Sequence, residues 1–190
     1  MATEIAPQPV DDVVLVLTQQ HERVRALLAE LHETVSAVAD ITCDMAEPFR
    51  ELVRLLVAHE AGEELVVYPA LRSALEEGPL ANERMAEEDE AKHLLARLEK
   101  MASAFFDFPT VLAELRDKVL AHAEQEEHTV FPLLEQRLPA EERQRMARDF
   151  LYMAAKAPTH AHAHSPESAV GNAVLGPVLA TIDRMRDARH

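Results

Sequence analysis

Hydrophobic residues recur along this chain at alternating spacings of three and four, the pattern of helices that pack side by side. Three stretches show it most clearly. The first contains Leu17, His21, Val24, Leu28, Leu31, Val35 and Val38; the second contains Leu52, Leu56, His59, Glu63, Val66 and Ala70; the third contains Leu112, Leu115, Val119, His122, Glu126, Thr129 and Leu133. Each series is apolar except near its middle, where histidine or glutamate occupies core positions. We therefore expect helices whose packed faces share a polar layer.

Prolines indicate where the helices begin, because proline fits the first turn of a helix and disrupts its interior. The expected helices run from Pro9 to about Asp40, from Pro48 to near Gly78 and Pro79, from there to about Phe106, and from Pro109 to Leu138, and a shorter one begins at Pro139. Residues 156–168 (KAPTHAHAHSPES) have the composition of a linker, and residues 170–185 form a last amphipathic segment. The sequence therefore predicts an all-α protein.

Composition supports helices and excludes several classes of protein. Among 190 residues only four are glycine and 48% are hydrophobic, which favours a folded helical domain over strands or disorder. Acidic residues outnumber basic ones by 34 to 19, giving a formal charge of −15. With six Phe, two Tyr and no Trp, the chain lacks both the basic clusters and the stacking platforms of nucleic-acid-binding proteins. We expect no nucleic-acid partner.

The lack of recognisable targeting signals and the cysteine usage predict a soluble cytoplasmic protein. The single cysteine, Cys43, excludes an internal disulfide and a cysteine-rich zinc module, and is compatible with a reducing compartment. The N-terminus lacks the basic stretch of a signal peptide, and apolar runs such as Val13 to Leu17 are too short to cross a bilayer. We expect no membrane partner, and the oligomeric state is left open.

Five ionisable residues on the predicted core faces point to a metal centre. They are His21, His59, Glu63, His122 and Glu126. Burying an unpaired imidazole or carboxylate costs several kcal/mol, so these groups need common partners. A metal centre satisfies them together, since His and Glu four residues apart lie on one face of a helix. The alternatives are mutual pairing of these side chains, or a helix face rotated from the assumed one.

An internal repeat sharpens this interpretation. The stretch HEAGEELVVYPAL from His59 and the stretch HAEQEEHTVFPLL from His122 both have His, Glu-Glu at +4 and +5, Val at +8, an aromatic at +9, Pro at +10 and Leu at +12. Two helices thus present the same His-x-x-x-Glu arrangement. By analogy with carboxylate-bridged sites in helical bundles, the repeat suggests two metal ions bridged by two carboxylates.

The pattern of His21, His59-x-x-x-Glu63 and His122-x-x-x-Glu126, with the YPAL and FPLL tails, resembles the hemerythrin-like, or HHE cation-binding, proteins over residues 11–138. The resemblance implies an up-down four-helix bundle in residues 1–138, followed by a helical extension over residues 139–190. It also implies two iron ions with an oxo or hydroxo bridge. Glu63 and Glu126 would be the bridging carboxylates, and the three histidines would be terminal ligands.

The third helix departs from the family pattern. Family members usually carry histidine in a run like EHDEAK, whereas this chain has EEDEAK over residues 87–92, so Glu88 takes the place of the usual histidine. His93 is the alternative ligand. At 100° per residue, the apolar face of this helix is centred roughly 150° from His93, while Glu88 lies within about 80° of that centre. We expect Glu88 as the sixth ligand and His93 in solvent, a choice that a rotated or bulged helix would reverse.

Three weaker candidates lie near the predicted ligands or beyond the bundle. Tyr68, five residues after Glu63, is either a phenolate ligand or a packed aromatic, and packing is favoured. Glu60 is the foremost of the acidic neighbours, for which a surface role suffices. The tract with histidine at positions 160, 162 and 164 is of the kind that binds metal loosely or binds nothing specific.

The resemblance suggests dioxygen, peroxide or nitric oxide as the small molecule that such a centre takes. Three carboxylates stabilise ferric iron, so we expect oxygen, iron or oxidative-stress handling and not bulk oxygen transport. The alternatives are a catalase-like or ferroxidase-like enzyme, a redox or iron sensor that signals through residues 139–190, and a structural bundle without metal.

Overall fold

The computed structural model describes residues 12–37, 45–101 and 107–161. Within these ranges the regular structure is helical and no strand occurs, which confirms the predicted all-α class. None of the helices in these ranges combines the length and the apolar character needed to cross a membrane. The predicted segment 170–185, Cys43, and the histidines at 162 and 164 lie outside the described residues.

The first helix, α1 (Val13–Ala37), follows the predicted pattern. The carboxylate of Asp12 accepts a hydrogen bond from Val14 N–H at 3.0 Å, which satisfies one of the donors that the first turn leaves free. The predicted start at Pro9 and the predicted end at Asp40 lie outside the described residues. The face predicted from Leu17 to Leu31 is buried, including His21.

The two helices that carry the repeat each contain a π turn. One consists of α2 (Ala46–Gly62), the π segment η2 (Glu63–Val67) and α3 (Tyr68–Ser73). The other consists of α5 (Phe108–Gln125), the π segment η4 (Glu126–Val130) and α6 (Phe131–Arg137). Tyr68 N–H donates to Glu63 O, and Phe131 N–H donates to Glu126 O. A proline follows each π segment after one residue, and the wider turn accommodates a ring that has no N–H and would crowd the carbonyl four residues earlier.

These π turns shift the buried face by one residue. The sequence pattern predicted core positions at Val66, Ala70, Thr129 and Leu133, but these side chains are only partly buried. The residues immediately after them, Val67, Leu71, Val130 and Leu134, are each 0% exposed. That part of the prediction is wrong because a π turn contains one residue more than the α turn on which the pattern was based.

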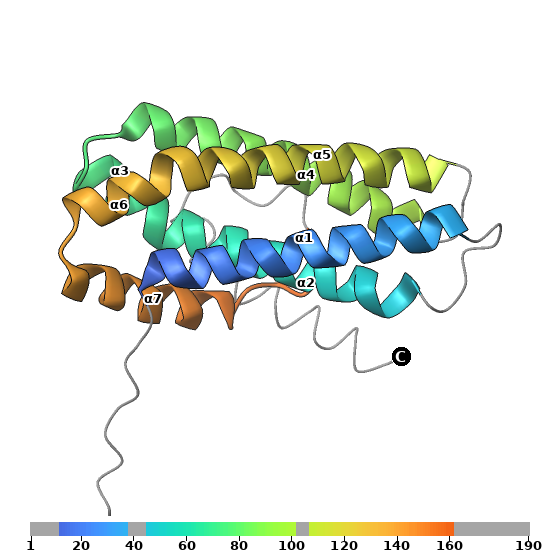
Figure 1. Cartoon of the computed structure of the whole chain (residues 1–190), viewed down its shortest axis with the longest axis horizontal. Coiled ribbons are helices and arrows are strands. Elements are labelled where there is room, and N and C mark those ends of the chain that lie inside the picture. The colour runs from blue at the N-terminus through green and yellow to red at the C-terminus, as the bar shows by residue number, and fades with distance from the viewer. Residues whose placement is uncertain (1–11, 38–44, 102–106, 162–190) are drawn as a thin grey trace, which may run out of the picture.

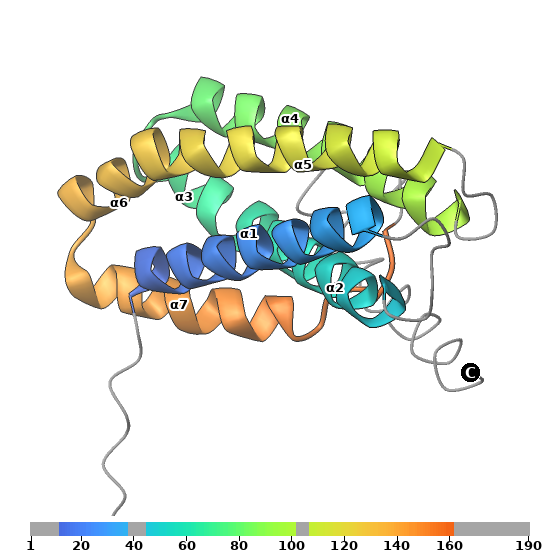
Figure 2. The same ribbon diagram turned by 45° about the vertical axis from the view of Figure 1, so that its right-hand side comes forward.

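The remaining helices complete the structure. Helix α4 (Gly78–Met101) packs against α5 and α3, and α1 packs against α2 and α5. Pro139 precedes α7 (Ala140–Ala154), as predicted, and α7 lies against α1, α2 and η2. Figures 1 and 2 show the long helices lying lengthwise beside one another, with α7 along the outside of α1 and α2.

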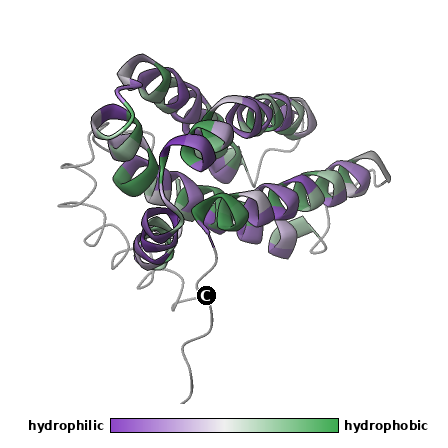
Figure 3. Ribbon diagram, turned by 60° about the vertical axis from the view of Figure 1, so that its left-hand side comes forward, coloured by the Kyte–Doolittle hydropathy of each residue, from purple (hydrophilic) through white to green (hydrophobic). Residues whose placement is uncertain are grey.

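Two hydrophobic clusters lie on either side of a polar layer. One contains Leu28, Leu56 and Leu115, and the other contains Leu17, Leu71 and Phe150. In Figure 3 the helices carry both hydrophobic and hydrophilic residues along their length, as expected for elements with one buried face. The second cluster takes in Met146, Ala147 and Phe150 of α7, so this helix shares its core with α1 and α3.

Candidate metal centre

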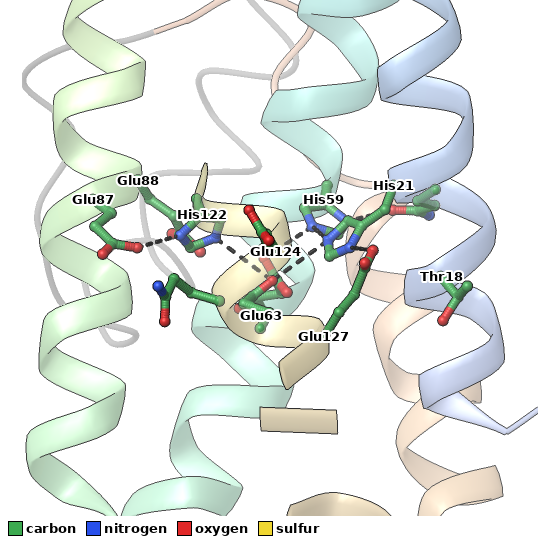
Figure 4. Close-up of polar contacts among 12 residues, drawn as sticks. Thr18, His21, His59, Glu63, Glu87, Glu88, His122, Glu124 and Glu127 are labelled. Carbon is green, nitrogen blue, oxygen red and sulfur yellow. Dashed lines mark hydrogen bonds and ion pairs between the residues drawn. The ribbon is translucent and has the colours of Figure 1, made fainter. Parts of the chain in front are cut away.

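The six residues predicted as ligands meet in the polar layer. His21 comes from α1, His59 from α2, Glu88 from α4 and His122 from α5, while Glu63 and Glu126 are the first residues of the two π segments. All are buried except His122, whose side chain is 12% exposed. Figure 4 shows His21, His59, His122 and Glu63 converging between the helices.

The donor atoms form two groups that share one carboxylate. His21, His59, Glu63 and Glu126 make the first group, and Glu63, Glu88 and His122 make the second; within each group the donor atoms lie within 4.8 Å of one another. Glu126 also lies between two histidines, because its Oε2 is 3.4 Å from His21 Nε2 and 3.6 Å from His122 Nε2. Each group could hold one metal ion.

All three histidines are oriented by an acceptor on a different helix. Nδ1 of His21 lies 2.9 Å from Glu127, Nδ1 of His59 lies 2.8 Å from Gln20, and Nδ1 of His122 lies 2.9 Å from Glu87. Carboxylate and amide oxygens accept hydrogen bonds, so each Nδ1 is the donor. Nε2 of every ring is then directed into the layer, the orientation that metal-binding histidines take.

Sequence reasoning missed these orienting residues. Each one stands directly beside a predicted ligand in the sequence: Gln20 before His21, Glu87 before Glu88, and Glu127 after Glu126. That adjacency was the available signal, but each residue bonds a histidine on another helix, which only the packed structure reveals. Arginines hold two of the carboxylates in turn, since Arg25 is 2.8 Å from Glu127 and Arg84 is 2.9 Å from Glu87.

Several donor atoms in the layer are buried without a hydrogen-bond partner. Both carboxylate oxygens of Glu63 are in this state, as are Oε2 of Glu88, Oε2 of Glu126 and Nε2 of His122. A buried polar atom without a partner costs about 1–3 kcal/mol, and more when it is charged. Mixed imidazole and carboxylate donors suit iron, manganese or zinc, and bound cations would satisfy all of these atoms at once. The residues present therefore fit a metal centre.

The carboxylates differ in their electrostatic surroundings. Burial raises the pKa of Glu63 well above its usual range, and the neighbouring Glu126 and Glu88 raise it further. Burial also raises the pKa of Glu88 to about 8, against the ammonium of Lys92. For Glu126 the effect of burial is outweighed by His122, His21 and His59, so its pKa falls to about 2. None of the groups that shift the pKa of Glu63 most strongly is a cation, so a bound metal would compensate its charge.

The histidines are also unequal. Burial, reinforced by His21, lowers the pKa of His59 to about 3, which keeps that ring neutral and able to bind a cation. Burial opposes protonation of His122 as well, but Glu126 and Glu87 outweigh it and raise its pKa to about 9. Without metal, His122 and Glu126 thus form an ion pair, which a cation would replace.

Tyr68 reaches the layer through its hydroxyl. Its side chain is packed at 0% exposure, and its hydroxyl also donates to Glu88 and, at 3.1 Å, to Glu126. The π turn explains this contact, because residue 68 stands five residues after Glu63, the span of one π turn. Burial raises the pKa of Tyr68 well above its usual range, so the phenol keeps its proton. Interpreting Tyr68 as a packed aromatic alone omitted these hydrogen bonds.

The other histidine candidates lie away from the layer. His93 is 52% exposed, and its Nδ1 bonds the backbone oxygen of Asp89 at 2.7 Å. Nδ1 of His160 lies 2.7 Å from Glu99, and neither His93 nor His160 belongs to the two donor groups.

A small cavity adjoins the histidines. It measures about 20 Å³ and is lined by His21, His59, His122, Glu60 and Glu88 together with five apolar side chains. Such a volume accommodates one molecule the size of water. The structure thus places a space for one small ligand beside the donor groups.

Fold and site together define the class: an all-helical protein with a buried histidine and carboxylate cluster that could hold metal cations. The sequence model of the Hemerythrin HHE cation binding domain matches residues 12–134. The chain therefore belongs to the hemerythrin HHE cation-binding family.

Two relatives show how far the similarity extends. An uncharacterized hemerythrin-like protein of Schizosaccharomyces pombe is 35% identical over 138 residues, which is 70% of this chain and 66% of that protein. A protein of Nostoc sp. named DNA nickase is 30% identical over 135 residues, which is 71% of this chain and 37% of that protein. The chain thus aligns with less than two thirds of either relative. No solved structure matched the chain with significance.

Proposed function

We propose that this chain is a non-haem di-iron protein that binds or reacts with dioxygen, peroxide or nitric oxide, in the handling of oxygen, iron or oxidative stress. In this proposal His21, His59, Glu63, Glu88, His122 and Glu126 hold the two iron ions within an up-down four-helix bundle. The observation that carries it is the pair of donor groups sharing Glu63 beside a cavity for one small molecule. The single cysteine supports a cytoplasmic location.

The donor set is compatible with iron. Three imidazoles and three carboxylates suit iron, and the anionic oxygens favour its ferric state. Bound iron would supply one-electron redox chemistry and a position for a small ligand. Val24, Leu56 and Val119 give the cavity an apolar lining beside the histidines. Tyr68 holds a proton on its hydroxyl beside Glu88 and Glu126, within the layer where a ligand would need one.

Metal analysis tests this function. The protein is loaded with ferrous iron without oxygen, exposed to air and desalted, and its iron content and absorption spectrum are measured. We expect two iron ions per chain and ferric charge-transfer bands. The variant Glu63→Ala should lose both, because Glu63 belongs to both donor groups. His93→Ala is the matched control and should load normally. Fewer than one iron per chain in the wild type would contradict the proposal.

The activity named for the Nostoc relative is not part of this proposal. The aligned region covers 37% of that protein, so its nickase activity has no defined place within the shared segment. A formal charge of −15 also opposes binding to a phosphate backbone.

Contact between α7 and the polar layer favours a second candidate, a sensor that signals through residues 139–190. The rings of Phe150 and His59 lie edge to face with centroids 6.0 Å apart. A change at His59 would therefore reach α7 directly. Hydrogen exchange of α7 should differ among the metal-free, ferrous and ferric proteins if this candidate holds. Identical protection in all three states would count against it.

A further inference from the structure

A second group of charged residues adjoins the polar layer. Glu60 on α2 and Glu64 on η2 lie one turn apart, and each is only 4% exposed. Lys92 of α4 reaches both: its Nζ contacts Glu64 and lies 3.7 Å from Oε2 of Glu60. We call Glu60, Glu64 and Lys92 the lysine-capped cluster.

The lysine-capped cluster and Glu88 together present more carboxyl groups than one ammonium can pair. Nζ of Lys92 also lies 3.7 Å from Oε2 of Glu88, so three carboxylates surround one ammonium. Oε2 of Glu60, of Glu64 and of Glu88 are all buried without a hydrogen-bond partner. Buried carboxylate oxygens without partners are costly, and a cation is the species that satisfies them. The cluster therefore has capacity for a cation in addition to Lys92.

The lysine-capped cluster lies between the surface and the polar layer. Lys92 is its most exposed member, with 19% of the side chain accessible, whereas Glu60 and Glu64 lie inside. Glu60 also lines the cavity that contacts His21, His59 and His122. Glu88 both contacts Lys92 and belongs to a donor group. Carboxylates thus follow one another from Lys92 inward to the candidate ligands.

We propose that the lysine-capped cluster is the route by which a divalent metal cation reaches the centre, with the Lys92 ammonium holding that route when no metal passes. The inference rests on the proposed function, since it requires a centre that takes up metal. An incoming ion exchanges water for the oxygens of Glu64 and Glu60 and passes to Glu88. Lys92 has a flexible four-carbon stem, which lets its ammonium move aside toward solvent.

Kinetics of cobalt uptake test the route. Co²⁺ is mixed with the metal-free protein without oxygen, and its visible absorption is followed by stopped flow to completion. The test variants are the double substitution Glu60→Gln with Glu64→Gln, and separately Lys92→Met. Glu90→Gln and Lys118→Met are matched controls, because Glu90 and Lys118 form an exposed ion pair at 2.6 Å that also involves α4.

The two test variants should change the rate in opposite directions. Removing both carboxylates should slow initial uptake about tenfold, the lower end of effects from a charged channel, while the final two ions per chain are kept. Lys92→Met should accelerate uptake, since the competing tethered cation is gone, and the controls should match the wild type. A wild-type rate in the double variant, slower uptake in Lys92→Met, or a reduced final stoichiometry in the double variant would each overturn the route.

Failure of the route and failure of the proposed function give different results. A wild type that takes up no Co²⁺ contradicts the proposed metal centre itself. A wild type that takes up two ions, with unchanged kinetics in the double variant, contradicts only the route. Circular dichroism checks the fold of each variant, and if Lys92→Met does not fold, the double variant and its Glu90→Gln control decide.

Discussion

The two copies of the repeat, residues 59–71 and 122–134, have the same backbone conformation but different surroundings. Both place a glutamate at the start of a π turn and a proline behind it. Helix α7 packs against the first copy, where Gly62 and Glu64 are buried, whereas Gln125 in the second copy is exposed and Glu127 is 28% exposed. The repeat thus determines the geometry of the donors, and the neighbouring helices determine how deeply each copy is buried.

Charge differs between the copies in the same way. Burial raises the pKa of Glu63 above its usual range, and the two carboxylates that it faces raise it further. Three histidines instead outweigh burial at Glu126 and bring its pKa to about 2. The aromatic positions also differ: Tyr68 donates to Glu88 and Glu126, whereas Phe131 stacks on His21 with ring centroids 5.4 Å apart. Two similar motifs therefore contribute unequal chemistry to one centre.

Exchanging the residues at the third position after each histidine should show the largest difference. A Cβ added at Gly62 would lie 2.6 Å from Cδ2 of Phe150, so Gly62→Gln should destabilise the protein by about 3 kcal/mol through overpacking. The reciprocal change, Gln125→Gly at an exposed site, should cost about 1 kcal/mol through helix propensity. Urea unfolding of both variants measures the difference, and equal costs would show that α7 does not cover the first copy.

Neutralising the two glutamates should have effects of opposite sign in the metal-free protein. Glu63→Gln should stabilise it by about 2 kcal/mol, because an uncompensated buried carboxylate is removed. Glu126→Gln should destabilise it by about 2 kcal/mol, because His122 loses one of its two carboxylate partners and keeps only Glu87. Urea unfolding at neutral pH in the presence of a chelator gives both values. The same sign in both variants would contradict the charge difference between the copies.

The pH dependence of stability should separate the same two residues. Glu126 has a folded-state pKa of about 2 against an ordinary value of 4.5, so its contribution is complete above pH 4.5 and is lost as the pH falls toward 2. The pKa of Glu63 is raised, so stability is lost as the pH rises above 4.5 toward the folded-state value. In the metal-free protein, Glu126→Gln should flatten the acid side of the profile and Glu63→Gln the other side. Unchanged profiles would oppose both assignments.

The aromatic exchange should have the smallest effect. Tyr68→Phe removes the hydroxyl that bonds Glu88 and Glu126 and should cost about 1 kcal/mol in the metal-free protein. The control is Leu133→Met, which conserves side-chain volume at a partly buried site in the second copy and should change the stability little. Thermal unfolding compares the two. A Tyr68→Phe variant as stable as the wild type would mean that the hydroxyl contributes nothing to the layer.

Much of this molecule could be predicted from its sequence, for identifiable reasons. The predicted starts at Pro48, Pro79, Pro109 and Pro139 lie at or near the first residues of α2, α4, α5 and α7, because ring geometry constrains prolines whatever surrounds them. His21, His59 and Glu63 could be singled out because polar residues on an apolar face are unusual. These residues do converge in the layer, and their role as ligands stays a prediction.

Other features depend on geometry that a regular helical period does not contain. After Glu63 and Glu126 the buried face moves by one residue, which a constant 100° step misses. The same shift brings Tyr68 toward the layer. Pro69 and Pro132, inside otherwise continuous helices, were the available sign that a turn would widen. The partners of the histidine Nδ1 atoms lie across helix interfaces, where sequence distance gives no guide.

The placement of Tyr68 also gives this protein an internal optical reporter. The chain has two tyrosines and no tryptophan, so its near-ultraviolet fluorescence comes from Tyr68 and Tyr152 alone. Tyr152 is 60% exposed on α7, whereas the hydroxyl of Tyr68 bonds two of the candidate ligands. A soluble quencher would reach Tyr152, and an iron ion bound in the polar layer would quench Tyr68. Emission can therefore follow occupancy of the centre in real time, without a label and in the unmodified chain.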